Sequence, residues 1–187
     1  MPARRTASFP GAPIAPVGNP LLSGLGPSAY AERRDEPVLT LEGDPNIVPL
    51  RVTHGHYYLH RRDPDPRGME VVGADDVVAG VVDEVWIDQG EPQVLYLEMT
   101  FAGDGRPRMV PFEYARICYP VWWPVRLFML QKGTPYLEVK ALRAEQFADV
   151  PPIKHPDQIT LLEEERIRAY FAGGFLYADP SRSEPLL

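Results

Sequence analysis

The alternation of apolar and polar positions between residues 46 and 145 predicts a series of short β-strands. Asp, Gly and Pro residues, which favour turns, separate these runs. The runs are IVPLRV, HYYLH, EVVGA, VAGVVDEVWID, VLYLEMTFA, RMVPFEYARICY and YLEVKAL. Short strands with alternating faces are typical of a small antiparallel barrel or sandwich. We therefore expect one β-domain over residues 46–145.

The last segment, residues 146–187, carries a helical pattern with a defined start. Thr160 and Glu163 have the spacing of a capping box, and Glu163, Glu164 and Glu165 place negative charge at the positive end of a helix. Gly173-Gly174 is typical of a helix end. We expect a helix over about residues 161–172, with the acidic run on its solvated face.

Residues 1–45 have a different pattern, in which Pro and Gly recur at a spacing that interrupts helices and sheet ladders. The segment predicts an extended arm. It also carries apolar residues that need to be covered, namely Phe9, Ile14, Val17, Leu21, Leu22, Leu25 and Tyr30. We expect this arm to lie on another subunit.

Composition narrows the class of protein. The net charge is −7, from 19 basic and 26 acidic residues, which argues against nucleic acid as the main partner because phosphate binding depends on Lys and Arg. The single cysteine, Cys118, excludes an internal disulfide and suits a small buried apolar position. The most apolar run, YPVWWPVRLFML at residues 119–130, is too short and too interrupted to span a bilayer.

The common catalytic motifs for cofactor, phosphate, zinc and nucleophile chemistry are not found in the sequence. His54 and His56 would share one face of a strand and could hold a metal or pass protons, although surface or packing histidines are the more ordinary interpretation. A hydrolase using either histidine would lack a nucleophile motif. The DPDPRGM run at 63–69 has carboxylates in a calcium-like order but no closing Glu, so it predicts a surface turn. We expect neither catalysis nor a bound metal.

Carboxylates are the more informative group. Glu84, Asp88 and Glu91 lie around Trp86 at the end of a predicted strand, close enough to repel one another and to share protons if partly buried. Such clusters also occur as solvated strand ends. The residues alone therefore predict an acidic β-barrel adaptor whose arm binds a partner.

Several long runs resemble one family. They are FPGAPIAPVGNPLLSGLGPSAYAERRD, NIVPLRV, DPDPRGMEVVGAD, AGVVDEVWIDQGEPQ and FADVPPIKHPDQITLLEEERIRAYFAGGFLYADP. In this order they resemble the H subunit of the purple-type bacterial photosynthetic reaction centre, over most of the chain. The resemblance implies a mainly β fold with a small α content: an extended arm, an antiparallel PRC-type β-barrel and a C-terminal helix. The barrel alone is shared with RNA-processing adaptors, so a free PRC-barrel adaptor in RNA or ribosome processing is the alternative.

The resemblance implies a non-catalytic subunit that caps the L and M subunits, stabilises the quinone sites and helps conduct protons to the secondary quinone. Bacteriochlorophyll, bacteriopheophytin, quinones and a non-haem iron would belong to partner subunits. The chain would lie at the cytoplasmic face of the photosynthetic inner (intracytoplasmic) membrane, as a peripheral subunit without nucleic-acid partners. The family's transmembrane helix would then be absent from this sequence or supplied by a separate polypeptide, and antenna subunits are further possible partners.

Residue by residue, the VWIDQGE run matches the family's proton-path acids at Asp88 and Glu91. Some family members gather protons at a surface histidine pair and an Asp, where this chain has Thr40, Glu42 and Asp44. We expect Glu42 and Asp44 to serve in their place. His54 and His56 fall later and leave open a shifted uptake point.

Two other family positions differ. A family acid beside the last helix matches Gln158, so Asp157 next to it is the expected proton-transfer residue. A family Arg in the strand after the acids matches Leu95.

The chain also has an insertion relative to the family, which we expect to form a hairpin over about residues 117–135. Trp122, Trp123, Phe128 and Arg126 have the makeup of a membrane or partner contact, with rings at headgroup level and cations toward phosphate. A longer hairpin that closes on its own barrel is the alternative.

Overall fold

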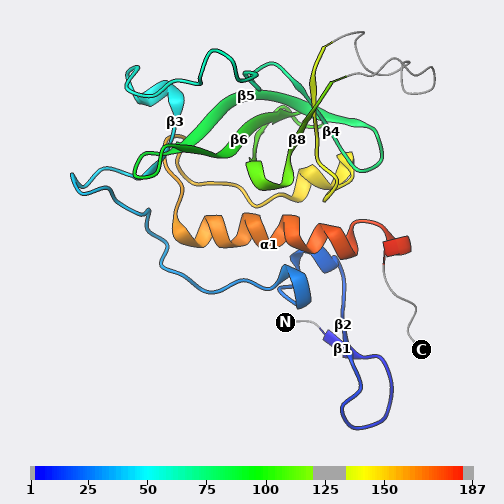
Figure 1. Ribbon diagram of the computed structural model, residues 1–187. Coiled ribbons are helices and arrows are strands. Elements are labelled where there is room, and N and C mark those ends of the chain that lie inside the picture. Colours follow the sequence, from blue (N-terminus) through cyan, green and yellow to red (C-terminus); the bar gives the residue numbers. More distant parts are fainter. Residues whose placement is uncertain (1–2, 120–133, 183–187) are drawn as a thin grey trace.

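The computed structural model describes residues 3–119 and 134–182, in which a curved sheet packs against one long helix (Figure 1). The strand order is β7-β6-β5-β4-β9-β8, and β3 also pairs with β5. These seven strands are β3 (Ile47–Pro49), β4 (Glu70–Val72), β5 (Val78–Asp88), β6 (Gln93–Phe101), β7 (Pro107–Pro111), β8 (Arg116–Cys118) and β9 (Tyr136–Glu138). The mainly β fold with a C-terminal helix is confirmed.

Strand β5 organises the sheet. It pairs with β6 along one edge, and β4 and β3 share the other edge. These pairings are antiparallel, whereas β4 and β9 run parallel, so the expectation of a wholly antiparallel sheet is wrong at this point. Parallel neighbours need a long crossover connection, and here the described residues between β4 and β9 form four other strands.

The predicted strand over residues 78–88 is confirmed with the same bounds. The HYYLH run, residues 56–60, is not a strand but part of the connection from β3 to β4. Just before it, His54 and Gly55 have φ values of +50° and +81°, which turn the chain out of an extended path. The RMVPFEYARICY run is divided by a 3-10 turn, η4 (Phe112–Tyr114), between β7 and β8.

The core lies between the sheet and the helix α1 (Leu161–Tyr177). Trp86, Tyr96 and Leu97 of the sheet and Ile167 and Phe171 of the helix are all fully or almost fully buried. Removal of this much apolar surface from water is the main driving force for the packing.

The expectation for Cys118 as a small buried residue is confirmed. It packs in a smaller cluster with Val72 and Tyr136, and a free cysteine commonly fills such a position as a small hydrophobe.

Helix α1 starts as predicted but ends later. The Thr160 hydroxyl accepts a hydrogen bond from the Glu163 N–H (3.2 Å), and the Glu163 carboxylate accepts one from the Thr160 N–H (2.9 Å), which confirms the capping box. The helix continues through Gly173 and Gly174 to Tyr177. A Cβ at these positions would lie 2.1 Å from Ser28 Oγ and 2.2 Å from the Ala141 carbonyl oxygen, so the glycines serve close packing rather than termination.

We expect Gly174→Ala to lower the free energy of unfolding by about 1–3 kcal/mol, because the added methyl group forces the backbone of Ala141 away. Helix propensity alone would favour alanine by about 1 kcal/mol. Urea denaturation of the full chain measures the difference, and a stabilised variant would show that the helix does not approach Ala141 this closely.

The predicted arm over residues 1–45, which we call the leader, divides into two parts. Strands β1 (Ala3–Arg5) and β2 (Ile14–Pro16) form a projecting hairpin (Figure 1). Beyond it, the turns η1 (Pro20–Leu22) and η2 (Gly26–Ser28) pack against α1, and Leu21 is only 4% exposed. Part of the predicted arm is therefore covered by the chain's own helix.

The leader also keeps exposed apolar side chains, among them Phe9, Ile14 and Val17 in its first part and Leu22 in η1. Their contact with another subunit stays a prediction. The predicted contact residues Trp122, Trp123, Arg126 and Phe128 lie outside the described residues, and the flanking strands β8 and β9 pair antiparallel.

Three short 3-10 turns complete the described elements. They are η3 (Leu50–Val52), η5 (Ala144–Asp149) and η6 (Pro180–Arg182). Within residues 3–119 and 134–182, no helix combines the length and apolarity needed to cross a bilayer.

Candidate functional site

Asp88 closes strand β5 and organises the turn that follows. Its Oδ1 atom accepts hydrogen bonds from the Gly90 N–H (2.7 Å), the Glu91 N–H (2.9 Å) and the Asn46 side-chain amide (2.9 Å). An Asp side chain that accepts from backbone N–H groups two and three residues later stabilises a turn of this kind. The Asp88 carboxylate is thus held in a fixed position, partly buried, while the Glu91 side chain is exposed.

The loop before β3 is fastened to the same turn. Gln89 donates its backbone N–H to the Asn46 carbonyl (2.8 Å) and its side-chain amide to the Pro45 carbonyl (2.9 Å). Both bonds link the β5–β6 turn to the segment that carries Glu42 and Asp44. Residues far apart in sequence are therefore joined around Asp88.

An open cavity of about 390 Å³ lies at this junction. Exposed Glu42 and Asp44 line it, together with Asn46, the residue that hydrogen-bonds Asp88. The Thr40 Oγ1 atom is buried and has no hydrogen-bond partner within the described residues. Glu42 and Asp44 thus share a cavity with Asn46, and Asn46 in turn hydrogen-bonds Asp88.

Glu164, on the first turn of α1, adds a carboxyl group that the sequence analysis assigned only to a solvated helix face. Its Oε2 atom accepts a hydrogen bond from the Tyr96 hydroxyl (3.1 Å). Burial raises the pKa of Glu164, and the negative charges of Asp88 and Glu165 raise it further against the opposing Tyr96 hydrogen bond and Arg168 charge. Burial also raises the pKa of Tyr96, so this hydroxyl stays a donor.

Arg168, on the next turn of the helix, places a positive charge near the Glu164 carboxylate. Its guanidinium lies 5.7 Å from the centre of the Tyr96 ring and 3.6 Å from a Glu113 carboxylate oxygen. Glu164 and Arg168 have i, i+4 spacing, which brings side chains together on one helix face. This spacing, together with an acid at the helix start, is a sequence signal that could have identified Glu164.

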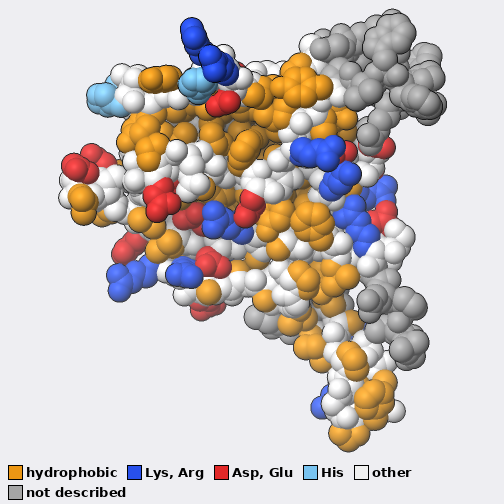
Figure 2. Space-filling view, in the orientation of Figure 1, with side chains coloured by type: hydrophobic (Ala, Val, Ile, Leu, Met, Phe, Trp, Pro, Cys, Tyr) orange, Lys and Arg blue, Asp and Glu red, His pale blue; other side chains and the backbone are white. Residues whose placement is uncertain are grey.

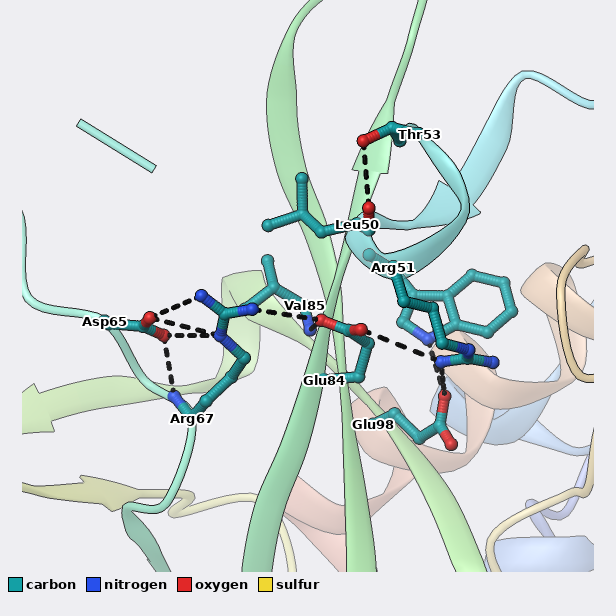
Figure 3. A network of polar contacts seen from close by, with 9 residues as sticks. Leu50, Arg51, Thr53, Asp65, Arg67, Glu84, Val85 and Glu98 are labelled. Carbon is teal, nitrogen blue, oxygen red and sulfur yellow. Dashed lines mark hydrogen bonds and ion pairs between the residues drawn. The ribbon is translucent and has the colours of Figure 1, made fainter. Parts of the chain in front are cut away.

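Asp157, the other predicted proton-transfer residue, lies in a different cluster around Arg51. Figure 3 shows Arg51 of this cluster with Glu84 and Glu98. Its carboxylate pairs with Arg51 (3.0 Å), which also contacts the carboxylates of Glu98 (3.3 Å) and Glu84 (4.0 Å). The Trp86 indole N–H donates to the same Glu98 oxygen (2.9 Å). Asp157 is therefore not among the residues that line the Glu42–Asp44 cavity.

Glu84 and Glu98 are direct cross-strand neighbours on β5 and β6. Like charges in this arrangement destabilise a sheet unless cations compensate them. Arg51 approaches from one side, and Arg67, which also binds Asp65, approaches Glu84 from the other (3.8 Å). The expected grouping of Glu84 with Asp88 and Glu91 is thus replaced by a pairing of Glu84 with Glu98.

The remaining candidates are at the surface. His54 and His56 are exposed. The DPDPRGM segment is a turn held by the Asp65–Arg67 ion pair (2.6 Å). In the part of the chain that the structure describes, no three His, Cys, Asp or Glu side chains group as metal ligands.

Comparison with known families gives two matches in sequence order. The PRC-barrel domain matches residues 60–121, which include β4–β8, and the sheet built around β5 fits this assignment: the chain is a PRC-barrel protein. The family described as photosynthetic reaction centre, H-chain N-terminal region, matches residues 1–52. The two matches, in this order along the chain, support an H subunit of the photosynthetic reaction centre.

This family is a structural subunit of a membrane-associated complex that contains other subunits. The H-chain match sets the chain apart from free PRC-barrel adaptors. Glu42 and Asp44 lie within the H-chain match, and Asp88 and Glu91 lie within the PRC-barrel match. Asp157 and Glu164 lie beyond both.

Proposed function

We propose that this chain caps the L and M subunits on their cytoplasmic face and helps conduct protons to the secondary quinone. The observation that carries the relay is that Asp88 hydrogen-bonds Asn46, which lines the Glu42–Asp44 cavity, while the negative charge of Asp88 also raises the pKa of the partly buried Glu164. A quinone buried in protein cannot collect protons directly from solvent, so ionisable groups must lead to it. This chain supplies acids at the surface and inside the fold.

The order of burial gives the relay a direction. Glu42 and Asp44 are exposed and meet solvent protons first, and Asp88 and Glu164 are partly buried. A carboxyl group with a raised pKa exchanges protons closer to neutral pH, which suits it for transfer. Tyr96 holds the Glu164 carboxylate in place by its hydroxyl.

The leader supports the capping role. Phe9, Ile14, Val17 and Leu22 are exposed on the segment that matches the H-chain family. Exposed apolar side chains that recur along one segment mark a contact with a partner. We infer that the first part of the leader lies on the L and M subunits, whose pigments, quinones and non-haem iron are not bound by this chain.

The relay is tested by the double substitution Asp88→Asn with Glu91→Gln in the assembled reaction centre. Neither amide can carry a proton as a carboxylate does, so we expect the second, proton-coupled electron transfer to the quinone to slow by roughly tenfold or more. Time-resolved absorption after two flashes measures this step. Primary charge separation should stay unchanged, because it needs no proton from this chain.

A matched control is Glu70→Gln, which changes a partly exposed carboxylate on β4, outside the cavity and the Asp88 turn. Its kinetics should equal those of the unaltered complex. Unaltered second electron transfer in the Asp88/Glu91 variant would show that protons do not pass these residues.

A further inference from the structure

Residues 53–62, which we name the basic lobe, form part of the connection between η3 and β4. Their sequence is THGHYYLHRR, which contains three of the four histidines of the chain, two arginines, two tyrosines and no acidic residue. The whole chain has a net charge of −7, so the lobe is opposite in sign to the chain as a whole. Most of it, residues 53–59, falls between the two family matches.

The lobe is held in place near its start. The Thr53 hydroxyl donates to the Leu50 carbonyl (2.9 Å), the His56 N–H donates to the Thr53 carbonyl (3.0 Å), and the Tyr57 hydroxyl donates to the Gln89 carbonyl (3.0 Å). On either side of it, Arg51 and Arg67 are engaged by the carboxylates of the sheet (Figure 3). A surface fixed in this way loses little conformational entropy on binding.

The cations of the lobe itself point outward. Arg61 and Arg62 are exposed, and neither forms a side-chain ion pair within residues 3–119 and 134–182. Tyr58 is 83% exposed. Figure 2 shows Arg and His side chains gathered at the top of the molecule, where this segment runs in Figure 1, above a band of apolar side chains.

A cavity of about 450 Å³ lies beside these cations. Leu50, Leu59 and both tyrosines give it apolar walls, and Arg61 and His60 lie on its wall. Of the acids that line it, Asp65 and Glu84 are already paired with Arg67, which leaves Asp63. Tyr and Arg around a concave apolar site are the composition of a protein-binding hot spot.

We propose that the basic lobe and its cavity dock an acidic segment of another protein subunit, with one apolar side chain of that segment in the cavity and its carboxylates on Arg61 and Arg62. The concave shape favours a peptide segment over a flat bilayer surface. This docking rests on the presence of the chain in a multi-subunit complex and does not depend on the proton relay.

The test places the photo-reactive residue p-benzoylphenylalanine at position 58 of the full chain in the assembled complex. Illumination should yield an adduct with an acidic segment of another protein subunit, identified by mass spectrometry. Arg61→Glu with Arg62→Glu should lower the yield roughly tenfold, because the charge attraction becomes repulsion. Asp63→Asn should raise the yield.

The matched control is Arg106→Glu, an exposed arginine between β6 and β7 that lies outside the basic lobe and the leader, and it should leave the yield at position 58 unchanged. Pigment absorption shows whether each variant assembles. If the charge-reversed lobe prevents assembly, Arg61→Gln with Arg62→Gln removes the two positive charges without reversing them. Adducts with lipid alone, no adduct, or a yield that ignores the lobe charges would overturn the proposal. The kinetics of the second electron transfer test the proton relay separately, so failure of the docking proposal and failure of the relay can be told apart.

Discussion

Glu164→Gln is expected to slow proton delivery to the secondary quinone by roughly tenfold in the assembled complex, because the amide cannot release a proton. The side chain keeps its shape, and its oxygen still accepts the hydrogen bond that the Tyr96 hydroxyl donates to Oε2. The structure around it should therefore stay intact. The rate of the second electron transfer as a function of pH measures the effect.

The same substitution should raise stability at neutral pH. Burial raises the pKa of Glu164 above its ordinary value of 4.5, so the folded chain binds this proton more tightly than the unfolded chain does. The resulting stabilisation is present below the ordinary pKa and is lost as the pH rises through the raised pKa. Glu164→Gln removes this loss. The unfolding free energy of the variant should therefore fall less between acidic and neutral pH than that of the unaltered chain.

Opposite effects on the electron-transfer rate and on stability distinguish a proton carrier from a structural residue, since substitution of a structural residue would lower both. Glu165→Gln is the matched control: it alters the neighbouring carboxylate, whose partner is the exposed Arg33 (2.9 Å), and should change stability by less than about 1 kcal/mol. If Glu164→Gln leaves the electron-transfer rate unchanged at every pH, protons do not pass this carboxyl group.

Arg51→Met is expected to lower the free energy of unfolding by about 1–3 kcal/mol. Glu84 and Glu98 lie directly opposite each other, and the Arg51 guanidinium contacts both. Without it, two partly buried carboxylates repel each other, and the Asp157 loop loses its anchor. The side chain of Arg51 is 39% exposed, so solvent screening keeps the loss below that of a fully buried pair.

A double-mutant cycle isolates the charge contribution. Adding Glu98→Gln to Arg51→Met should recover part of the loss, with a coupling of about 0.5–3 kcal/mol measured by urea denaturation. Arg33→Met is the control, because its exposed pair with Glu165 contributes little. Additive losses in the cycle would show that Arg51 acts through packing rather than through Glu98.

The sequence predicted the elements whose signals are local. Strand β5 follows from its β-branched run, and the start of α1 follows from the Thr160–Glu163 spacing, since both depend on residues within a few positions of each other. The position of Asp88 at the end of a strand likewise follows from neighbouring residues.

Signals that depend on distant partners were read incorrectly. Gly173-Gly174 looked like a helix end, but the approach of Ser28 and Ala141 requires glycine there. Glu164 belongs to an acidic run that predicts a solvated helix face, but in the structure it accepts a hydrogen bond from Tyr96, and the charge of Asp88 helps to raise its pKa.

The sequence by itself thus determined the class of fold, the acidic character and the family of this protein, because composition, periodicity and motif order are properties of the chain alone. Only the tertiary structure decided which carboxylates meet. It placed Glu42 and Asp44 in one cavity with Asn46, which hydrogen-bonds Asp88, and it set Glu84 opposite Glu98 with Arg51 in contact with both. The reason is physical: burial and charge–charge interactions act between groups brought together by strand pairing and helix docking, whatever their separation along the chain.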